Sequence, residues 1–389
     1  MNRIILIAGL FLLLLSATPG EDGGGVARNS AGRSNGSLIP SGVELSAIAT
    51  AIDEKRKELN VPGVSVVIVK DDKVIFIKGF GLRDVEHNLP VTPDTIVGIG
   101  SCTKAFTAMA AVISEDEGKL SIDDSPRKYL PYFKLHDPDA DAKVTIRDLL
   151  SHRTGVPDKI GTYINSKTPR EDVIKAAMVV KPTAKLGEKF QYNNVMYSAA
   201  GEAVARAQGS TWEAVIAEKI FKPLGMTASN TSIQETYKTA DYTLGYHVSK
   251  SKAKQVKLLD LNNIAGAGAI NSNATDMAKW IRLMLNGGWF DGKRLVSEKN
   301  FAQLITKQIK ASADADYCLG WGRGLKNGKT FITHTGGTDG FTTLVDLMPE
   351  EKIGWAILLN VDETTLHSEI RKIIIANLVE SAKAKANSH

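Results

Sequence analysis

The sequence predicts an α+β fold, an α/β sandwich in which helices flank one antiparallel five-stranded sheet and a mainly helical lobe is inserted. β-branched runs occur near the start of the chain, at 63–80, and return after residue 317. Between about 120 and 310 the chain instead shows short helical patterns separated by loops. Because strand patterns stand at both ends of the chain, we expect the two ends to pair in a single sheet.

The first 20 residues have the pattern of a secretory signal peptide. Arg3 precedes an almost entirely apolar run, Ile4 to Leu15, which is followed by small and turn-forming residues. That run is too short to span a membrane. Residues 21–42 are rich in Gly, Ser and Asn and predict a flexible linker. We therefore expect a secreted or periplasmic protein, without a membrane span after signal removal, whose folded domain covers 43–385.

The sheet lobe, about 43–115 and 265–385, is expected to begin with a helix and two strands. Helical periodicity over 43–59 ends at the turn signal Asn60-Val61-Pro62-Gly63. The β-branched runs 63–70 and 73–80 are separated by Asp71-Asp72 and predict a hairpin.

A buried helix is predicted to begin at Ser101. The segment Ser101-Cys102-Thr103-Lys104 precedes an apolar run at 105–113 that is too hydrophobic on every side for a surface helix. Ser101 and Lys104 share one face of its first turn. Burial lowers the pKa of a lysine, so Lys104 could accept a proton from the Ser101 hydroxyl. Cys102 is the weaker candidate nucleophile, because residues 102 and 104 do not share a helix face.

The inserted lobe, about 116–264, contains Tyr192-Asn193-Asn194 in a loop before a predicted helix. Such a tyrosine is usually a half-buried loop residue. Two nearby cations could lower its pKa enough for proton transfer, and Lys104 and a protonated His334 are the candidate cations. The helical patterns between about 120 and 310 lie at 146–151, 171–178, 197–208, 212–221 and, already within the sheet lobe, 275–285.

Strand patterns return at 317–325, 330–335, 341–348 and 353–361, and a helix at 364–382 ends the domain. Asn327-Gly328 is a strong hairpin signal between the first two of these strands. The segment His334-Thr335-Gly336-Gly337 follows, and its glycines would let backbone N–H groups approach a ligand. A Gly-rich turn is the plain alternative. We expect a functional site in a cleft between the lobes.

Composition argues against nucleic-acid binding and metal chemistry. The net charge of +5 comes from 48 basic and 43 acidic residues that are scattered along the chain, and the basic cluster 250–257 lacks interleaved aromatics. The seven histidines show no metal-ligand spacing, and no G-x-S-x-G motif or Gly-rich phosphate loop is present. We expect no cofactor, no metal and a small-molecule or peptide substrate. Cys102 and Cys318 do not establish a disulfide.

Together, the Ser101–Lys104, Tyr192–Asn194 and His334–Gly336 segments resemble the three motifs of the serine β-lactamase and penicillin-binding superfamily, and specifically its class C branch. That branch includes class C β-lactamases, D-Ala-D-Ala carboxypeptidases, D-aminopeptidases and β-lactamase-like esterases. The resemblance covers about 43–382. It is supported by the segments 149–155, 221–226, 265–268 and 319–322.

The resemblance implies that Ser101 is the acylated nucleophile and Lys104 its base. Tyr192 would be a second general base that passes the proton to the leaving group. The backbone N–H groups of Ser101 and Gly337 would form the oxyanion hole.

It also implies that Asn194 binds the substrate amide and that Thr335 with His334 meets the substrate carboxylate. Class C β-lactamases carry Lys-Thr-Gly where this chain has His334-Thr335-Gly336, and histidine looks more like the carboxypeptidase side of the branch. Asn193 stands where serine is usual. His152 is expected to be a packed, hydrogen-bonded residue outside the catalytic set.

We therefore expect an exported serine hydrolase that forms an acyl-enzyme on Ser101 with peptides or amides ending in D-amino acids, or with related β-lactams. A β-lactamase-like carboxylesterase is the alternative within enzymes. A penicillin-binding sensor, which would be acylated without turnover, is the alternative of another class.

Overall fold

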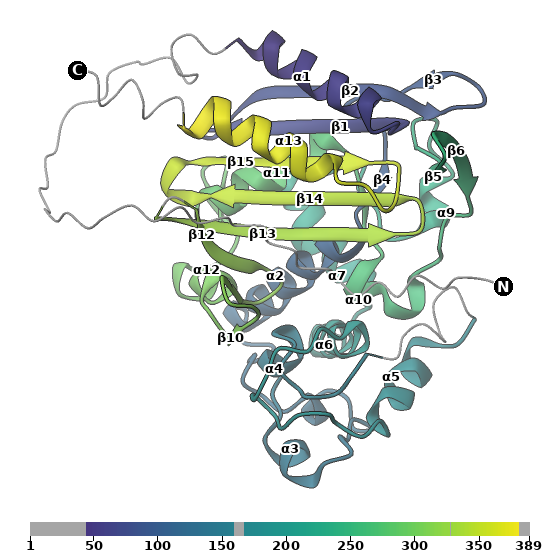
Figure 1. Cartoon of the computed structure of the whole chain (residues 1–389). Coiled ribbons are helices and arrows are strands. Elements are labelled where there is room, and N and C mark those ends of the chain that lie inside the picture. The colour runs from purple at the N-terminus through teal and green to yellow at the C-terminus, as the bar shows by residue number, and fades with distance from the viewer. Residues whose placement is uncertain (1–43, 159–166, 327, 381–389) are drawn as a thin grey trace, which may run out of the picture.

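A nine-stranded antiparallel sheet forms the middle layer of the protein (Figure 1). The computed structural model describes residues 44–158, 167–326 and 328–380. The predicted signal peptide, 1–20, and linker, 21–42, lie outside the described residues. Within them, no helix has the length and apolarity needed to cross a membrane.

The two ends of the chain meet in the middle of this sheet. β1 (Gly63–Lys70) pairs antiparallel with β15 (Ile353–Leu359), with Val64 opposite Leu359. The predicted pairing of both chain ends is thus confirmed. The strand order is β10-β11-β12-β13-β14-β15-β1-β2-β3. The remaining strands of the sheet are β2 (Lys73–Asp84), β3 (Leu89–Pro90), β10 (Ile309–Lys310), β11 (Ala315–Tyr317), β12 (Gly322–Lys326), β13 (Lys329–Thr338) and β14 (Phe341–Met348).

The predicted number of five strands is wrong. β3, β10 and β11 are two or three residues long, too short for alternating polarity to mark them in the sequence. The predicted strand 317–325 is broken into β11 and β12 by a turn at Gly320, which has a φ of +75°. A Cβ at Gly320 would lie 2.8 Å from the Lys104 carbonyl oxygen, so glycine allows this turn to contact the buried helix.

β12 and β13 form the expected hairpin, with Lys326 opposite Lys329. Residue 327, which belongs to the turn between them, lies outside the described part of the chain. Three short two-stranded ladders complete the β structure: β4 (Val97–Gly98) with β7 (Asn271–Ser272), β5 (Gly245–Ser249) with β6 (Lys252–Val256), and β8 (Trp289–Phe290) with β9 (Lys293–Arg294).

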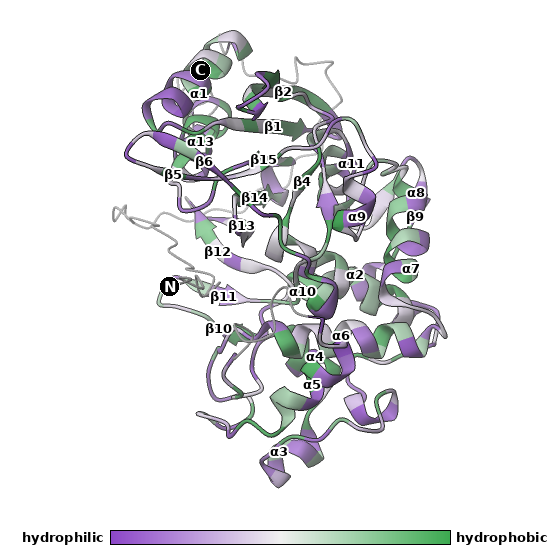
Figure 2. Ribbon diagram, turned by 90° about the vertical axis from the view of Figure 1, so that its right-hand side faces the viewer, coloured by the Kyte–Doolittle hydropathy of each residue, from purple (hydrophilic) through white to green (hydrophobic). Residues whose placement is uncertain are grey.

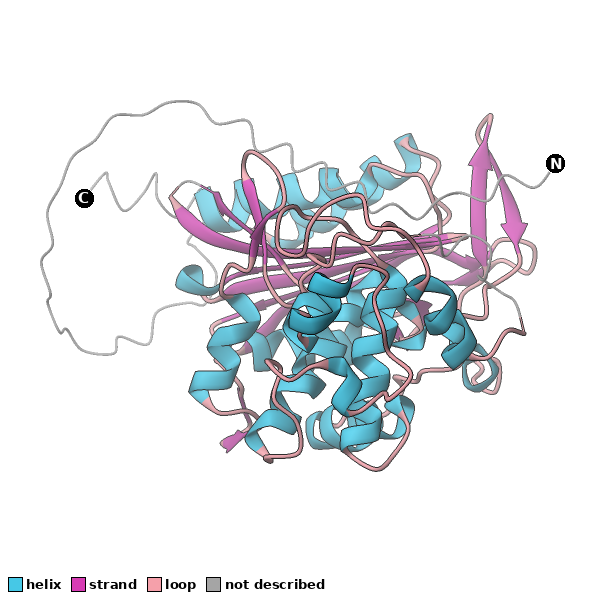
Figure 3. Cartoon of the chain, turned by 90° about the horizontal axis from the view of Figure 1, so that it is seen from below, coloured by secondary structure: helices cyan, strands magenta, loops and turns pink. Residues whose placement is uncertain are grey.

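Helices cover both faces of the sheet, as Figure 3 shows. α1 (Leu45–Glu58) and α13 (Leu366–Ile375) pack together on one face. Burial of both faces explains why the central strands read as continuous apolar runs (Figure 2). In β15, Trp355 and Ile357 join the core under the terminal helices, whereas Ala356 and Leu358 join the core on the opposite face.

The helix predicted after Ser101 lies at the centre of that opposite core. α2 (Thr103–Asp116) is buried from Thr103 to Ser114, as its all-round apolarity requires. It is preceded by a 3₁₀ turn, Gly100–Cys102, so Ser101 lies just before the α-helix.

The other helices surround α2 or form the lower lobe of Figure 1. α6 begins at Asn194, three residues before the prediction, because the Asn193 side chain caps it by accepting the Met196 N–H. These helices are α3 (Pro138–Lys143), α4 (Ile146–Leu150), α5 (Arg170–Met178), α6 (Asn194–Ala207), α7 (Trp212–Ile216), α8 (Lys222–Leu224), α9 (Ile233–Thr236), α10 (Ala265–Gly268), α11 (Ala274–Leu285) and α12 (Glu298–Ile305).

Candidate active site

Ser101 lies where the 3₁₀ turn before α2 meets strand β13. Gly100 has a φ of +50°, and a Cβ there would lie 2.9 Å from the Gly337 backbone nitrogen. Glycine at position 100 therefore allows the turn to contact the strand directly. Ser101 itself is 8% exposed, so its hydroxyl is almost enclosed.

Lys104 is fully buried and its Nζ lies 3.1 Å from the Ser101 Oγ. Two further acceptors surround the Nζ: the Asn194 Oδ1 at 2.7 Å and the Ala267 carbonyl oxygen at 2.9 Å. Burial lowers the pKa of Lys104 from 10.5 to about 7. A neutral amine has two N–H groups, which can donate hydrogen bonds to Asn194 and Ala267. Its lone pair is then free to accept the Ser101 proton.

Tyr192 is held beside this pair by the loop that contains His152. The Gln191 N–H donates to the His152 carbonyl oxygen at 2.7 Å, and the Asn193 N–H donates to the His152 Nδ1 at 3.0 Å. Both neighbours of Tyr192 are thus fixed to one residue. The rings of His152 and Tyr192 lie 4.2 Å apart between centroids. The Lys104 Nζ lies 4.7 Å from the centre of the Tyr192 ring.

The lowered pKa that the sequence suggests for Tyr192 is contradicted by the structure. Burial raises the pKa of Tyr192 above its usual value, and the interaction of its phenol with the neighbouring Ser101 hydroxyl offsets only part of that rise. The phenol oxygen is buried without a hydrogen bond of ordinary length to a described group. Tyr192 is therefore a neutral phenol that can donate its own proton only as it receives another.

His334 is not the cation that the sequence predicts. Its ring is buried, its Nδ1 donates to the Thr335 carbonyl oxygen at 2.7 Å, and its Nε2 lies 3.2 Å from the Tyr317 hydroxyl, which donates to it. Burial, together with the charge of Lys104, lowers the pKa of His334 to about 3. Of the two residues expected to meet a substrate carboxylate, the partly exposed Thr335 is the accessible one.

Two adjacent glycines of β13 have different surroundings. A Cβ at Gly336 would lie 2.0 Å from the Ile99 carbonyl oxygen and 2.4 Å from the Thr343 Oγ1, whereas a Cβ at Gly337 would have no atom within 4 Å. Gly336 therefore packs against the turn that carries Ser101, and Gly337 faces open space. The backbone of Gly337 lies next to that turn, since a Cβ at Gly100 would lie 2.9 Å from the Gly337 nitrogen.

His152 is a packed residue, as expected. It is fully buried, and its φ of +58° directs both its carbonyl group and its ring to the Tyr192 loop. Burial lowers the pKa of His152, so it is neutral. Two ion pairs hold the chain around it: Arg153, the next residue, pairs with Asp148, and Arg147 in the preceding helix α4 pairs with Asp123.

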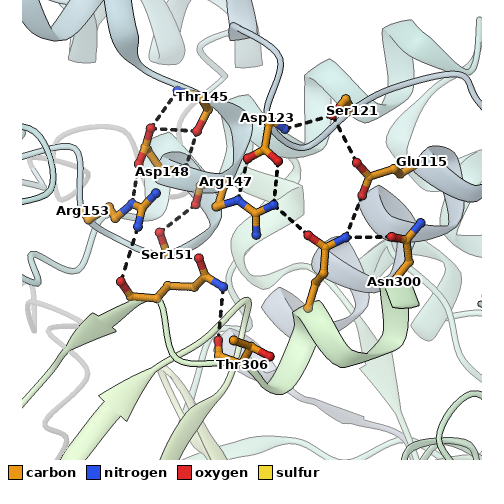
Figure 4. Close-up of polar contacts among 12 residues, drawn as sticks. Glu115, Ser121, Asp123, Thr145, Arg147, Asp148, Ser151, Arg153, Asn300 and Thr306 are labelled. Carbon is orange, nitrogen blue, oxygen red and sulfur yellow. Dashed lines mark hydrogen bonds and ion pairs between the residues drawn. The ribbon is translucent and has the colours of Figure 1, made fainter. Parts of the chain in front are cut away.

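Figure 4 shows how these contacts connect the lower lobe to the sheet lobe. The Arg147 Nη2 donates to the Gln303 Oε1 of α12 at 2.7 Å, and Gln303 in turn donates to Glu115 of α2 at 3.0 Å. The Arg153 Nη1 donates to the Gln308 carbonyl oxygen at 3.4 Å. The loop that positions Tyr192 is therefore fixed to the helix that carries Lys104.

Asp158 is a polar residue of the site that the sequence analysis missed. Its Oδ2 accepts two hydrogen bonds from Asn194, at 3.0 Å from the backbone nitrogen and at 2.7 Å from the side-chain Nδ2. No motif marks Asp158, because its partner is 36 positions away in the sequence. The Asn193 Nδ2 donates to the Val156 carbonyl oxygen at 2.9 Å and fixes the same loop to the start of α6.

A largely apolar pocket that opens to solvent lies beside the turn that carries Ser101, because Gly98 and Gly268 line it. Gly268, one of its lining residues, follows the Ala267 that accepts from Lys104, and Thr338 follows Gly337. Apolar side chains from α9, β14 and the segments before and after α10 form much of the wall, among them Ile233, Leu258, Leu261, Ala269 and Phe341. Amides and hydroxyls at its rim belong to Thr231, Asn262, Asn271 and Thr338.

Both cysteines are free thiols and are buried. The Cys102 Sγ lies 3.4 Å from the His334 carbonyl oxygen, so it points into the protein and away from a nucleophile's position. Burial raises the pKa of Cys102 to about 12. Across 44–158, 167–326 and 328–380, no cluster of three His, Cys, Asp or Glu side chains has a geometry that could hold a metal ion.

The family model described as Beta-lactamase matches residues 48–379. Protein flp of Staphylococcus aureus (strain COL) is 30% identical over 320 residues, which are 81% of this chain and 63% of that protein. The unguisins hydrolase ungD' of Aspergillus campestris is 27% identical over 351 residues, 85% of this chain and 64% of that protein. The chain thus spans a little under two thirds of these relatives.

Among solved structures, the octameric penicillin-binding protein homologue from Pyrococcus abyssi superimposes with a TM-score of 0.75 at 29% sequence identity. The similarity covers 86% of this chain and 79% of that one.

Proposed function

The chain belongs to the β-lactamase family of serine hydrolases, and from this premise we propose that it cleaves amide or ester bonds through an acyl-enzyme on Ser101. The observation that carries the proposal is the buried Lys104, whose Nζ lies 3.1 Å from the Ser101 Oγ. Its two other acceptors, Asn194 and Ala267, leave the lone pair of a neutral amine for the Ser101 proton.

In the acylation step, the Ser101 Oγ attacks the substrate carbonyl while its proton passes to the Lys104 Nζ. The backbone N–H groups of Ser101 and Gly337 stabilise the negative charge that develops on the carbonyl oxygen. The leaving group departs with a proton that Tyr192 supplies as a phenol, and Lys104 restores the Tyr192 proton. Water then attacks the acyl-enzyme, and the same groups transfer protons in reverse to release Ser101.

We propose that the substrates are peptides or amides ending in D-amino acids, as for a D-Ala-D-Ala carboxypeptidase, or related β-lactams, with Thr335 as the contact for a substrate carboxylate. The largely apolar pocket lined by Leu258, Leu261 and Phe341 would take an uncharged group of the substrate. We also propose that the protein is exported, since residues 1–20 have the pattern of a signal peptide.

A β-lactamase-like carboxylesterase is the second candidate, and the neutral His334 favours it. Because both ring nitrogens of His334 are bonded within the protein, a substrate without a carboxylate loses nothing at this position. A penicillin-binding sensor has the same groups around Ser101 and differs only in the rate of deacylation.

The test is intact mass of the purified protein over time with a penicillin and, separately, with a fluorophosphonate, which labels activated serines. We expect a fluorophosphonate adduct on the wild type and none on Ser101→Ala. Ser125→Ala is the matched control, because Ser125 also stands in an S-x-x-K sequence but is exposed and does not precede a buried α-helix. Equal labelling of Ser101→Ala and the wild type would contradict the proposal.

The penicillin distinguishes the candidate functions. A penicilloyl adduct that persists on Ser101 supports a peptidase or sensor, and one that forms and clears while the drug is consumed means a β-lactamase. Labelling by the fluorophosphonate alone favours esters or D-amino peptides.

A further inference from the structure

Four side chains form a hydrogen-bonded line from a loop of the lower lobe to the nucleophile. The Asp158 Oδ2 lies 2.7 Å from the Asn194 Nδ2, the Asn194 Oδ1 lies 2.7 Å from the Lys104 Nζ, and that nitrogen lies 3.1 Å from the Ser101 Oγ. Asn194 and Lys104 are both buried. The only carboxylate in this line is Asp158.

The orientation of the Asn194 amide decides whether Lys104 can act as a base. With its oxygen toward Lys104, Asn194 accepts one N–H and leaves the amine lone pair for the Ser101 proton. With the amide reversed, its NH₂ would donate to that lone pair and compete with Ser101. An asparagine has no intrinsic preference between these two orientations, so a neighbouring group must select one.

Asp158 has the chemistry to make that selection. An ionised carboxylate only accepts hydrogen bonds, so it favours the orientation in which the Asn194 Nδ2 faces it and the Oδ1 faces Lys104. The same Oδ2 accepts the Asn194 backbone N–H at 3.0 Å. That N–H is at the first residue of the 14-residue helix α6, where an anion is also favoured by the helix dipole.

We propose that Asp158 is a positioning residue that fixes the Asn194 amide with its oxygen toward Lys104 and so keeps the lysine lone pair available to Ser101. This inference rests on the proposed acyl-enzyme chemistry at Ser101. Asp158 acts through Asn194 and needs no contact with the substrate.

The charge of Asp158 provides a readout that a purely structural role would not change. Burial lowers the pKa of Lys104, and the negative charge of Asp158 opposes this by raising it. The titratable and charged groups around Lys104, taken over all elements packed against it, are Asp158, Cys102, His152, Tyr192, Tyr197 and His334. Removing the negative charge of Asp158 should therefore make Lys104 lose its proton at a lower pH.

The experiment measures the rate of fluorophosphonate labelling of Ser101 from pH 5 to 9 in wild type, Asp158→Asn, Asp158→Ala and Asp158→Glu. We expect Asp158→Asn and Asp158→Ala to label at least roughly 10-fold more slowly at the optimum. The acidic limb of their profiles should move to lower pH by roughly 0.5 to 1 pH unit. Asp158→Glu, which keeps an ionised acceptor, should recover part of the rate and return the limb toward its wild-type position.

Asp137→Asn is the matched control, because Asp137 also accepts a backbone N–H at a helix start, that of α3, without a bond to Asn194. It should label as the wild type does. A slower rate with an unshifted acidic limb, or a wild-type rate and limb in all three Asp158 variants, would overturn the inference. Since wild type and Ser101→Ala are measured in parallel, loss of the Ser101-dependent label would instead contradict the proposed function.

Discussion

A charged side chain is buried on each side of the sheet, and the surroundings of the two side chains differ. On the face covered by α1 and α13, the outer face, the carboxylate of Asp346 is fully buried under α13. It accepts from the Arg371 Nε and Nη2, both at 2.9 Å, and from the Trp355 Nε1 at 2.7 Å. On the inner face, the equally buried Lys104 has three oxygen acceptors, and all belong to uncharged groups.

The difference shows what converts a buried charge into a reactive group. A bidentate guanidinium neutralises the charge of Asp346, and the pair fixes α13 to β14. Lys104 is separated from the carboxylate of Asp158 by the Asn194 amide, so burial prevails and its pKa falls to about 7. Asp346 thus forms a complete ion pair that stabilises the outer face, whereas Lys104 has no directly bonded carboxylate at the site where a proton must be transferred.

The largest expected effect is on the pH dependence of stability. The pKa of Lys104 is about 7 in the folded protein and 10.5 as the ordinary value. The free-energy cost of burying protonated Lys104 is therefore paid in full below pH 7 and decreases as the pH rises toward 10.5. Over that range Lys104 keeps its proton in the unfolded state and loses it in the folded state, so folding becomes more favourable with rising pH. The unfolding free energy of the wild type should rise over that range, relative to Lys104→Met, by up to roughly 5 kcal/mol.

Urea unfolding of both proteins at several pH values between 7 and 10 measures this difference. Lys104→Met should also lose fluorophosphonate labelling, since it lacks the base. Parallel stability curves for the two proteins would mean that Lys104 titrates normally, and the contrast between the two faces would then be wrong.

The next effect is on the outer face. Arg371→Met leaves the Asp346 carboxylate buried without its cation, so we expect a loss of about 3–5 kcal/mol in unfolding free energy. The double variant Asp346→Asn with Arg371→Met removes the charge and keeps an acceptor for Trp355, and it should recover most of that loss. Labelling of Ser101 per folded molecule should stay at the wild-type level. A variant that kept its stability but lost labelling would show that this pair serves the active site.

The sequence predicts the features of this molecule that depend on local pattern. Ser101 and Lys104 are three residues apart, so helical geometry alone brings them to one face. β15 is apolar along its whole length and β1 is apolar except at Ser65 and Lys70, because both faces of the sheet are covered.

Features that depend on long-range packing could not be predicted in the same way. The Lys104 contact with the Ala267 carbonyl oxygen uses a backbone atom that any residue supplies. The neutrality of His334 depends on its enclosure by Tyr317 of β11, and the sequence pattern alone allows a histidine in a strand to face solvent instead. Asp158 reaches Asn194 only because the loop before it is fixed to the start of α6.

The smallest expected effects distinguish two neighbouring glycines of β13 within the inner face. Gly336→Ala would place a Cβ 2.0 Å from the Ile99 carbonyl oxygen, so the strand and the Ser101 turn must separate. We expect a loss of about 1–3 kcal/mol in unfolding free energy and slower labelling of Ser101. Gly337→Ala meets no atom within 4 Å and keeps its backbone N–H, so its stability should change by less than about 0.5 kcal/mol.

Thermal unfolding and fluorophosphonate labelling of the two variants give a direct comparison. Gly337→Ala should label at a rate close to that of the wild type, because an oxyanion hole needs the N–H of residue 337 and no particular side chain. Slow labelling of a stable Gly337→Ala would mean that the methyl group occupies space the reacting group needs. Equal rates for Gly336→Ala and the wild type would mean that contact between β13 and the Ser101 turn does not set the geometry of the site.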